Sequence, residues 1–477
     1  MKVYKVKLLC FSLILILTSC ASRYGYYSTL SSLLLSENYI KANEFIEQNK
    51  FKYYSEKDAL LYWLDKGITL HYAGDYNESI KAFTKAEKIA EELYTRSISE
   101  EAASFLVSDS VKSYYGEDFE RIFINVFQSL NYLFLQQYEG ALVEARKVDH
   151  KLKTLQVDYA GKNVYKEDAF MRYLTGLLYE SQKEFNDAFV SYRKAIGEYS
   201  ANKKIYNFAI PEDLLYRMLK VSKILRLREE FEEITTKFSL NTQYKEFNID
   251  LENGEIILFH YNGFAPYKVD NYIEVSFGEA WAYVGSIEVK TQDEAEVEKA
   301  RQIARAIASN EQFIVAFPKF VPIDNKVKSA TVEVYDETGE KIYAGKPFIV
   351  EDLDNIAIKN LEDRIAKIKV KSIARAAIKY ALSREIAIKL SKNSDELSSW
   401  LIKKALQTTS VVLEQADKRS WRTLPKQIFI FTASLKPGKY FVKINFEDGQ
   451  NRIVQKKEFN NIFITSGKKT FLSVRTY

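Results

Sequence analysis

Small and aromatic residues recur at fixed spacing in the first half of the chain, and this pattern limits its fold most. One stretch, YWLDKGITLHYAGDYNESIKAFTKAEKIA, begins at Tyr62, and a second, FMRYLTGLLYESQKEFNDAFVSYRKAI, begins at Phe170. The matching positions are Gly67, Leu70, Ser79, Phe83 and Ala86 in the first stretch and Gly176, Tyr179, Ala188, Tyr192 and Ala195 in the second. Small residues let two antiparallel helices approach closely, and aromatic residues fill the space between them. Each stretch therefore predicts a helical hairpin, with Trp63 as a further large residue of the first.

This spacing is that of a tetratricopeptide repeat. A weaker third copy, NVFQSLNYLFLQQYEGALVEARKV, offers Ser129, Tyr132, Ala141, Ala145 and Val148. In each copy a polar turn lies between the two helices: AGDY, LQQY or SQKEF. The copies are not about 34 residues apart, as in a perfect tandem array, so we expect segments inserted between them. A plain helical bundle is the alternative. Stacked repeats would form a curved surface suited to binding peptides or helices.

The second half has a different periodicity. Alternating apolar runs, among them GEIILFHY, YIEVSF, WAYVGSIEVK and ATVEVYDETGEKIYAG, are bounded by turn pairs such as Asn-Gly and Pro-Gly and predict strands and hairpins. Residues 293–309 and 354–392 have helical patterns instead. We therefore predict an α+β chain: an all-α tetratricopeptide-like helical repeat domain over residues 20–247, followed by a mixed antiparallel-sheet domain with helices over residues 248–477.

The N-terminus has the three parts of a secretory signal: the basic MKVYKVK, the apolar LLCFSLILIL and the small-residue TSCAS. The apolar run is far shorter than the roughly 20 residues of a membrane-spanning helix. Residues 17–20, LTSC, resemble the lipobox of bacterial lipoproteins, which implies removal of the signal peptide, residues 1–19, and lipid attachment at Cys20. An ordinary signal peptide with an incidental cysteine is the alternative. Cys10, the other cysteine, would leave with the signal, so no disulfide is expected.

No aspartate follows Cys20, which by resemblance to Gram-negative sorting rules favours the periplasmic face of the outer membrane. Removal of residues 1–19 takes away three lysines and no acid, so the formal net charge of +5 falls to about +2. A balance this even provides no broad attractive field for nucleic acid. We expect a lipid-anchored protein that does not bind nucleic acid.

The run DKRSWRTLP, residues 417–425, leads into a predicted strand and resembles the most recognisable segment of an uncharacterised family of bacterial outer-membrane lipoproteins. NGFAPYK, residues 262–268, and RAAIKYAL, residues 375–382, are similar to other segments of that family. The family combines N-terminal tetratricopeptide-like repeats with a C-terminal mixed α/β domain, and no enzymatic activity is known for it. The resemblance implies a partner in the cell envelope, either another lipoprotein or a pore protein of the curli-export type.

Two interpretations of this run remain open. In the structural one, Trp421 closes the core where helix gives way to strand. In the functional one, Arg419, Trp421 and Arg422 form an exposed anchor for a protein partner, because tryptophan and arginine dominate binding hot spots. The substitution Trp421→Ala separates the two.

No motif of an enzyme or metal site is evident. The three histidines, His71, His150 and His260, lack a second ligand at metal-binding spacing, and no nucleophile elbow or phosphate-binding glycine loop occurs. We expect no catalytic activity, no metal and no cofactor. The leading prediction is a lipid-anchored periplasmic scaffold or assembly protein that binds other envelope proteins through its repeat surface. The alternative is a peptidoglycan-binding module or a regulator of cell-wall synthesis.

Overall fold

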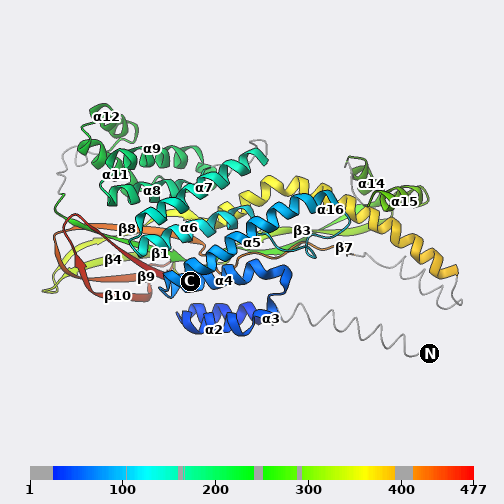
Figure 1. Ribbon diagram of the computed structural model, residues 1–477, viewed down its shortest axis with the longest axis horizontal. Helices are drawn as coiled ribbons and strands as arrows, with labels where there is room; N and C mark the ends of the chain where they lie inside the picture. The colour runs from blue at the N-terminus through cyan, green and yellow to red at the C-terminus, as the bar shows by residue number, and fades with distance from the viewer. Residues whose placement is uncertain are drawn as a thin grey trace.

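The computed structural model describes residues 25–103, 105–158, 165, 167–240, 251–286, 293–392 and 412–477. Its first half is helical and tetratricopeptide-like, and its second half combines three sheets with helices (Figure 1). This is the predicted fold class. Helix α12 ends at Lys237 and strand β1 begins at Gly254, and the predicted boundary between residues 247 and 248 lies outside the described residues.

The helices of the first half form five consecutive hairpins. Their members are residues 25–35 with α2 (Tyr39–Gln48), α4 (Ala59–Tyr72) with α5 (Tyr76–Ala103), α6 (Asp118–Phe134) with α7 (Tyr138–Asp158), α8 (Ala169–Ser181) with α9 (Phe185–Ala201), and α11 (Glu212–Ile224) with α12 (Arg228–Lys237). Three short helices lie between them: α3 (Lys50–Tyr53), η1 (Glu56–Asp58) and α10 (Lys203–Tyr206). The three predicted copies are the second, third and fourth hairpins.

All five hairpins turn in the same way. The middle residue of each three-residue turn has a positive φ: Glu37, Gly74, Gln136, Lys183 and Arg226. The N–H of the next residue donates a hydrogen bond to the carbonyl five residues earlier, in the preceding helix. Examples are Asp75 N–H to the Leu70 carbonyl (3.0 Å) and Glu184 N–H to the Tyr179 carbonyl (2.9 Å). This hydrogen bond is that of a Schellman motif, which satisfies carbonyls that a helix end leaves free.

The second half contains two four-stranded sheets packed face to face. The first, which we call the central sheet, has the order β11-β1-β8-β6, and its strands are β1 (Gly254–Asn262), β6 (Phe348–Asp352), β8 (Gln427–Leu435) and β11 (Lys469–Thr476). The second has the order β10-β9-β4-β5, and its strands are β4 (Ser329–Asp336), β5 (Lys341–Gly345), β9 (Gly438–Glu447) and β10 (Ile453–Ile464). All of these pairings are antiparallel except that of β1 with β11.

The central sheet is covered on both faces. Strand β1 is buried along its whole length, and its side chains alternate between two cores. Ile257, Phe259 and Tyr261 pack with the repeat helices, whereas Ile256 and Leu258 pack with the second sheet. Because residues of both halves belong to the same core, the repeats and the central sheet form one body.

A third sheet lies at the far end of the molecule, in a part that we call the distal lobe. Its strands are β2 (Tyr267–Ser276), β3 (Gln312–Val321) and β7 (Val412–Glu414), and it packs with α14 (Phe277–Gly285), α15 (Glu294–Ala304) and the long helix α16 (Leu353–Lys392). Helix α16 runs from the central sheet into this lobe (Figure 1). The predicted strand WAYVGSIEVK is wrong in its first half, because Ser276 and Glu279 form a capping box that starts helix α14.

Candidate binding site

The run at residues 417–425 lies in the interior, between the repeat helices and the central sheet. Trp421 is 1% exposed, and its ring meets those of Phe83 and Phe127 edge-on at centroid distances of 5.7 and 6.4 Å. Its main-chain N–H donates to Glu120 (2.6 Å), and its indole N–H donates to the hydroxyl of Thr423 (3.0 Å). The prediction of an exposed anchor is therefore wrong for Trp421, and the structural interpretation holds.

The two arginines of the run differ in exposure. Arg419 is buried, and its guanidinium donates to Asp417 (2.7 Å) and forms an ion pair with Asp58 (3.2 Å). A buried arginine held by two carboxylates cannot contact a partner, so the anchor prediction is wrong here too. Arg422 is half-buried, and its guanidinium lies 4.6 Å from the ring of Tyr27. Trp421 thus joins the run to the second and third hairpins, Arg419 joins it to η1, and Arg422 joins it to the first hairpin.

Carboxyl groups around this run have unusual pKa values. Burial raises the pKa of Asp65 to about 6, although Thr423 and Tyr54 donate hydrogen bonds to it (2.6 and 2.7 Å). Burial and the nearby Glu117 raise the pKa of Glu120 to about 7. Perturbed carboxyls occur at active sites and also in structural networks. Here their hydrogen bonds hold the run in place, and neither group lines a cavity described below.

The chain itself also covers the inner surface of the repeats. Helix α6 is buried along almost its whole length, and His71 of α4 bridges Asn131 of α6 (2.7 Å) and the hydroxyl of Tyr261 in β1 (3.0 Å). Burial lowers the pKa of His71 to about 4, so the ring is neutral at pH 7. The curved surface that the sequence suggested for peptides or helices is therefore not available to them, because the central sheet and the 417–425 run occupy it.

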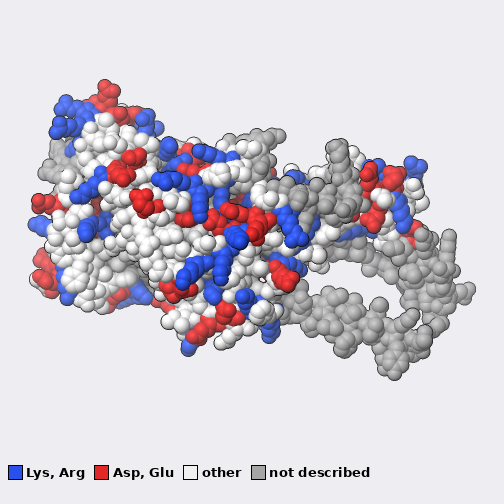
Figure 2. All heavy atoms as spheres, in the orientation of Figure 1, with Lys and Arg blue, Asp and Glu red and all other residues white. Residues whose placement is uncertain are grey.

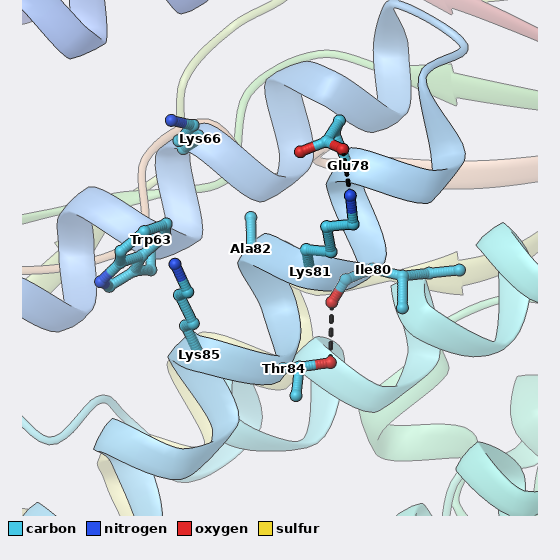
Figure 3. Close-up of a pocket in the computed structure, with 8 residues that line it drawn as sticks. All are labelled: Trp63, Lys66, Glu78, Ile80, Lys81, Ala82, Thr84 and Lys85. Atoms are coloured by element: carbon cyan, nitrogen blue, oxygen red, sulfur yellow. Dashed lines mark hydrogen bonds and ion pairs between the residues drawn. The ribbon is translucent and has the colours of Figure 1, made fainter.

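An exposed pocket lies on the outer side of the first predicted repeat, between α4 and α5 (Figure 3). Its volume is about 390 Å³, and we call it the lysine–tryptophan pocket. Its lining residues are Trp63, Lys66, Glu78, Ile80, Lys81, Ala82, Thr84 and Lys85. In Figure 3 the side chain of Lys85 extends toward Trp63, and its ammonium lies 4.4 Å from the centre of a half-buried indole.

The pocket carries more positive than negative charge. Lys66 pairs with Glu47 (2.6 Å) and Lys81 pairs with Glu78 (2.5 Å). Lys85 forms no ion pair with a residue that the structure describes, and neither does Lys50, whose ammonium lies 5.5 Å from the Trp63 ring. On the face that Figure 2 shows, basic side chains gather over the first part of α5, and acidic side chains lie beside them. Such a surface suits an anionic ligand that also offers apolar contact.

Sequence reasoning took Trp63 for a core residue of the repeat and did not identify this pocket. The signal was present, because the lysines lie one residue before Gly67 and two residues before and after Phe83, on the helix faces that point away from the hairpin core. A second cavity, of about 240 Å³, opens between the two packed sheets beneath the link from β5 to β6, and it includes His260, Lys328 and Lys346. Burial lowers the pKa of His260 to about 3, so it is neutral there.

The residues that the structure describes contain no group of three or more His, Cys, Asp or Glu side chains that could hold a metal ion. Among the same residues, no helix is both long and apolar enough to cross a bilayer. Cys20, the predicted lipidation site, lies outside the described residues.

Comparisons with known proteins give only structural similarity of the helical region. No protein-family model matches the chain, and no curated protein matches it significantly. The apo form of RapI aligns over 46% of this chain and 72% of its own, at 14% identity and a TM-score of 0.32. MamA from Desulfovibrio magneticus RS-1 aligns over 47% and 97% (15% identity, TM-score 0.29). A putative kinesin light chain of Podosopora anserina with TPR-like repeats aligns over 48% and 98% (8% identity, TM-score 0.30).

Proposed function

We propose that this protein is a lipid-anchored scaffold at the periplasmic face of the outer membrane, where it binds another envelope protein. Two features support the proposal: the lipobox-like LTSC that ends at Cys20, and the tetratricopeptide-like repeats, a class of structure that commonly presents binding surfaces. A tethered scaffold needs only modest affinity, because a partner in the same membrane is held at a high effective concentration.

The lysine–tryptophan pocket is the surface that we propose for this partner. The observation that carries this choice is the occupied inner surface of the repeats, which leaves the outer side of the hairpins for intermolecular contacts. On that side Trp63 offers an aromatic face, and Lys85 offers an ammonium without a carboxylate partner among the described residues. Tryptophan beside a cation is a frequent centre of a binding hot spot.

The chemistry of the pocket specifies an acidic partner segment. A carboxylate of the partner would replace water around Lys85, and an apolar neighbour in the same segment would cover the indole of Trp63. We therefore expect binding that weakens as the ionic strength rises, since the ammonium groups are exposed to solvent and screened by salt.

The test is a quantitative pull-down from solubilised envelope with the full-length, lipid-anchored protein. Trp63→Ala and Lys85→Glu should each reduce recovery of a partner that the unmodified protein captures, by roughly tenfold or more for a hot-spot residue. The matched control is Lys194→Glu, because Lys194 follows Tyr192 as Lys85 follows Phe83 but Arg172, and not a tryptophan, takes the place of Trp63. Equal recovery with all three variants would contradict the proposed surface. Cosedimentation with purified peptidoglycan alone would favour the cell-wall alternative.

A further inference from the structure

The short helix α3 presents an unusually exposed aromatic residue. Phe51 is 92% exposed, the highest value among the exposed large hydrophobic residues of the described chain, and Lys50 and Lys52 flank it. We propose that this Lys50–Phe51–Lys52 tip rests in the surface of the lipid bilayer and fixes the orientation of the protein on the membrane. The inference rests on the proposed lipid anchor at Cys20 and adds a second, non-covalent contact.

The position of the tip relative to the anchor supports this inference. Tyr26, in the first described helix, packs directly beside α3, with ring-centroid distances of 4.6 Å to Tyr53 and 5.4 Å to Tyr54. Cys20 precedes Tyr26 by six residues, which can span at most about 20 Å. By comparison, helix α16 with its 40 residues is about 60 Å long. An acylated Cys20 therefore holds the α3 end of the molecule, and not the distal lobe, next to the bilayer.

The chemistry of the tip also matches a membrane surface. An aromatic side chain between two lysines can enter the boundary between headgroups and acyl chains while the ammonium groups stay with the phosphates. Each lysine near an anionic bilayer adds a modest attraction. A single exposed phenylalanine is ordinary on a protein surface, so the argument depends on its place beside the anchor.

The neighbouring contacts show how the tip and the pocket would work together. The ammonium of Lys50 lies 5.7 Å from the ring of Phe51 and 5.5 Å from that of Trp63. The tip and the lysine–tryptophan pocket are thus adjacent, on the part of the molecule where α2 and α3 lie beside α4 (Figure 1). A tip seated in the bilayer would hold the pocket at the membrane surface, within reach of a partner anchored in the same leaflet.

The cysteine content of the chain permits a clean test. Cys10 leaves with the signal and the thiol of Cys20 carries lipid, so Phe51→Cys gives the mature lipoprotein a single free thiol for an environment-sensitive fluorophore. The matched control is Val190→Cys, because Val190 is 48% exposed in α9, on the opposite side of the molecule in Figure 1. Both labelled proteins are reconstituted in vesicles of phosphatidylethanolamine and phosphatidylglycerol that carry a nitroxide-labelled lipid.

We expect the label at position 51 to shift its emission to the blue and to lose most of its intensity to the nitroxide, whereas the label at position 190 keeps its emission in water. Lys50→Glu with Lys52→Glu in the labelled protein should restore part of the lost intensity. If both labels report water while both proteins float with the vesicles, the anchor stands and the membrane-seated tip is refuted. If neither protein floats with the vesicles, the lipid anchor itself is refuted and the tip with it.

Discussion

At the scale of single residues, Trp421 joins the two halves of the chain. Its ring lies against Phe83 of α5 and Phe127 of α6, while its main-chain amide is held by Glu120. A side chain of this size at 1% exposure stabilises the folded protein, because its apolar area is removed from water and its atoms make close contacts with their neighbours. The segment that carries it comes from the second half, so its loss affects both halves.

We predict that Trp421→Ala lowers the free energy of unfolding by about 3–5 kcal/mol, the cost typical of a large aromatic removed from a core. Urea denaturation followed by far-UV circular dichroism measures the change. The control is Trp63→Ala, which should cost much less, because that indole is half-buried beside a pocket. A stable Trp421→Ala protein with normal unfolding would show that the run at residues 417–425 is not structural.

The buried carboxyl of Glu351 makes the stability of the protein depend on pH. It is fully buried in β6, and burial together with the nearby Asp168 raises its pKa well above the usual range. Asp168 caps helix α8 by accepting the amide of Met171 (2.7 Å) and the hydroxyl of Tyr165 (2.6 Å). Folding therefore favours the neutral form of Glu351, whereas the unfolded chain ionises it above its ordinary pKa of about 4.3.

A group whose pKa is raised by folding stabilises the protein below its unfolded pKa, and this contribution is lost as the pH rises toward the folded pKa. Glu351→Gln removes the titration and keeps the shape. We predict that the variant gains stability relative to the unmodified protein by about 1.4 kcal/mol per pH unit above pH ~4.5, up to the folded pKa of Glu351. Thermal unfolding from pH 5 to pH 9 measures it, and Glu362→Gln at an exposed site of α16 is the control. Parallel pH profiles for all three proteins would contradict the assignment.

At the scale of elements, each predicted hairpin depends on a close approach of two helices. A Cβ atom on Gly67 would lie 2.6 Å from the ring of Phe83, and one on Gly176 would overlap the ring of Tyr192. Tyr192 cannot move aside easily, since its hydroxyl donates to the buried Glu180 (2.6 Å). In the third hairpin Ser129 takes the place of the glycine, and the small Ala145 takes the place of the aromatic residue, so residue 145 supplies no ring against this position.

We predict that Gly176→Ala destabilises the protein by about 1–3 kcal/mol, the cost of overpacking a rigid core site. The control is Gly197→Ala in the facing helix α9, where nothing lies within 4 Å of the added Cβ. That change should stabilise the protein by roughly 0.5–1 kcal/mol, because alanine favours a helix over glycine. Melting temperatures that move in the same direction for both variants would contradict this account of the hairpins.

The hairpin pattern also shows what the sequence could and could not predict. Three hairpins were predictable because small and large residues alternate at helical spacing, and the alternation of β1 predicted a strand. The first and last hairpins lack that pattern of paired small and aromatic residues. The turns gave no signal either, because four of the five place a non-glycine residue in the left-handed region: Glu37, Gln136, Lys183 and Arg226. Helix α14 was missed because apolar alternation outweighed a single capping box.

The site was predicted less well than the fold, for a physical reason. Trp63 and Trp421 both stand among charged residues in the sequence, and only the packing of distant elements decides which one is covered. Trp421 is enclosed by helices more than 290 residues earlier in the chain, whereas Trp63 remains at the surface of its own hairpin. No local pattern contains that information, so the sequence alone could not tell the buried tryptophan from the more exposed one.

At the scale of the whole molecule, buried ion pairs join the repeats to the central sheet. Arg217 of α11 contacts Glu180 of α8 (2.9 Å), Asp213 (2.6 Å) and Glu255 of β1 (3.1 Å). Lys220 and Lys469 add two further positive charges against the same glutamates, so three acids face three bases. Removal of one member leaves an uncompensated buried charge.

We predict that the repeats and the central sheet open as one cooperative unit, because they share a core and this charge cluster. Hydrogen exchange measured by mass spectrometry at rising urea concentrations should give the same opening free energy for α6 and for β1, although they belong to different predicted domains. Arg217→Ala should lower both values together by about 3–5 kcal/mol. Arg452→Ala, which removes an exposed guanidinium that pairs with Asp448, should change neither by more than about 1 kcal/mol. Exchange of α6 at lower urea than β1 would instead mean that the repeats fold independently, and that their inner surface can open to a partner after all.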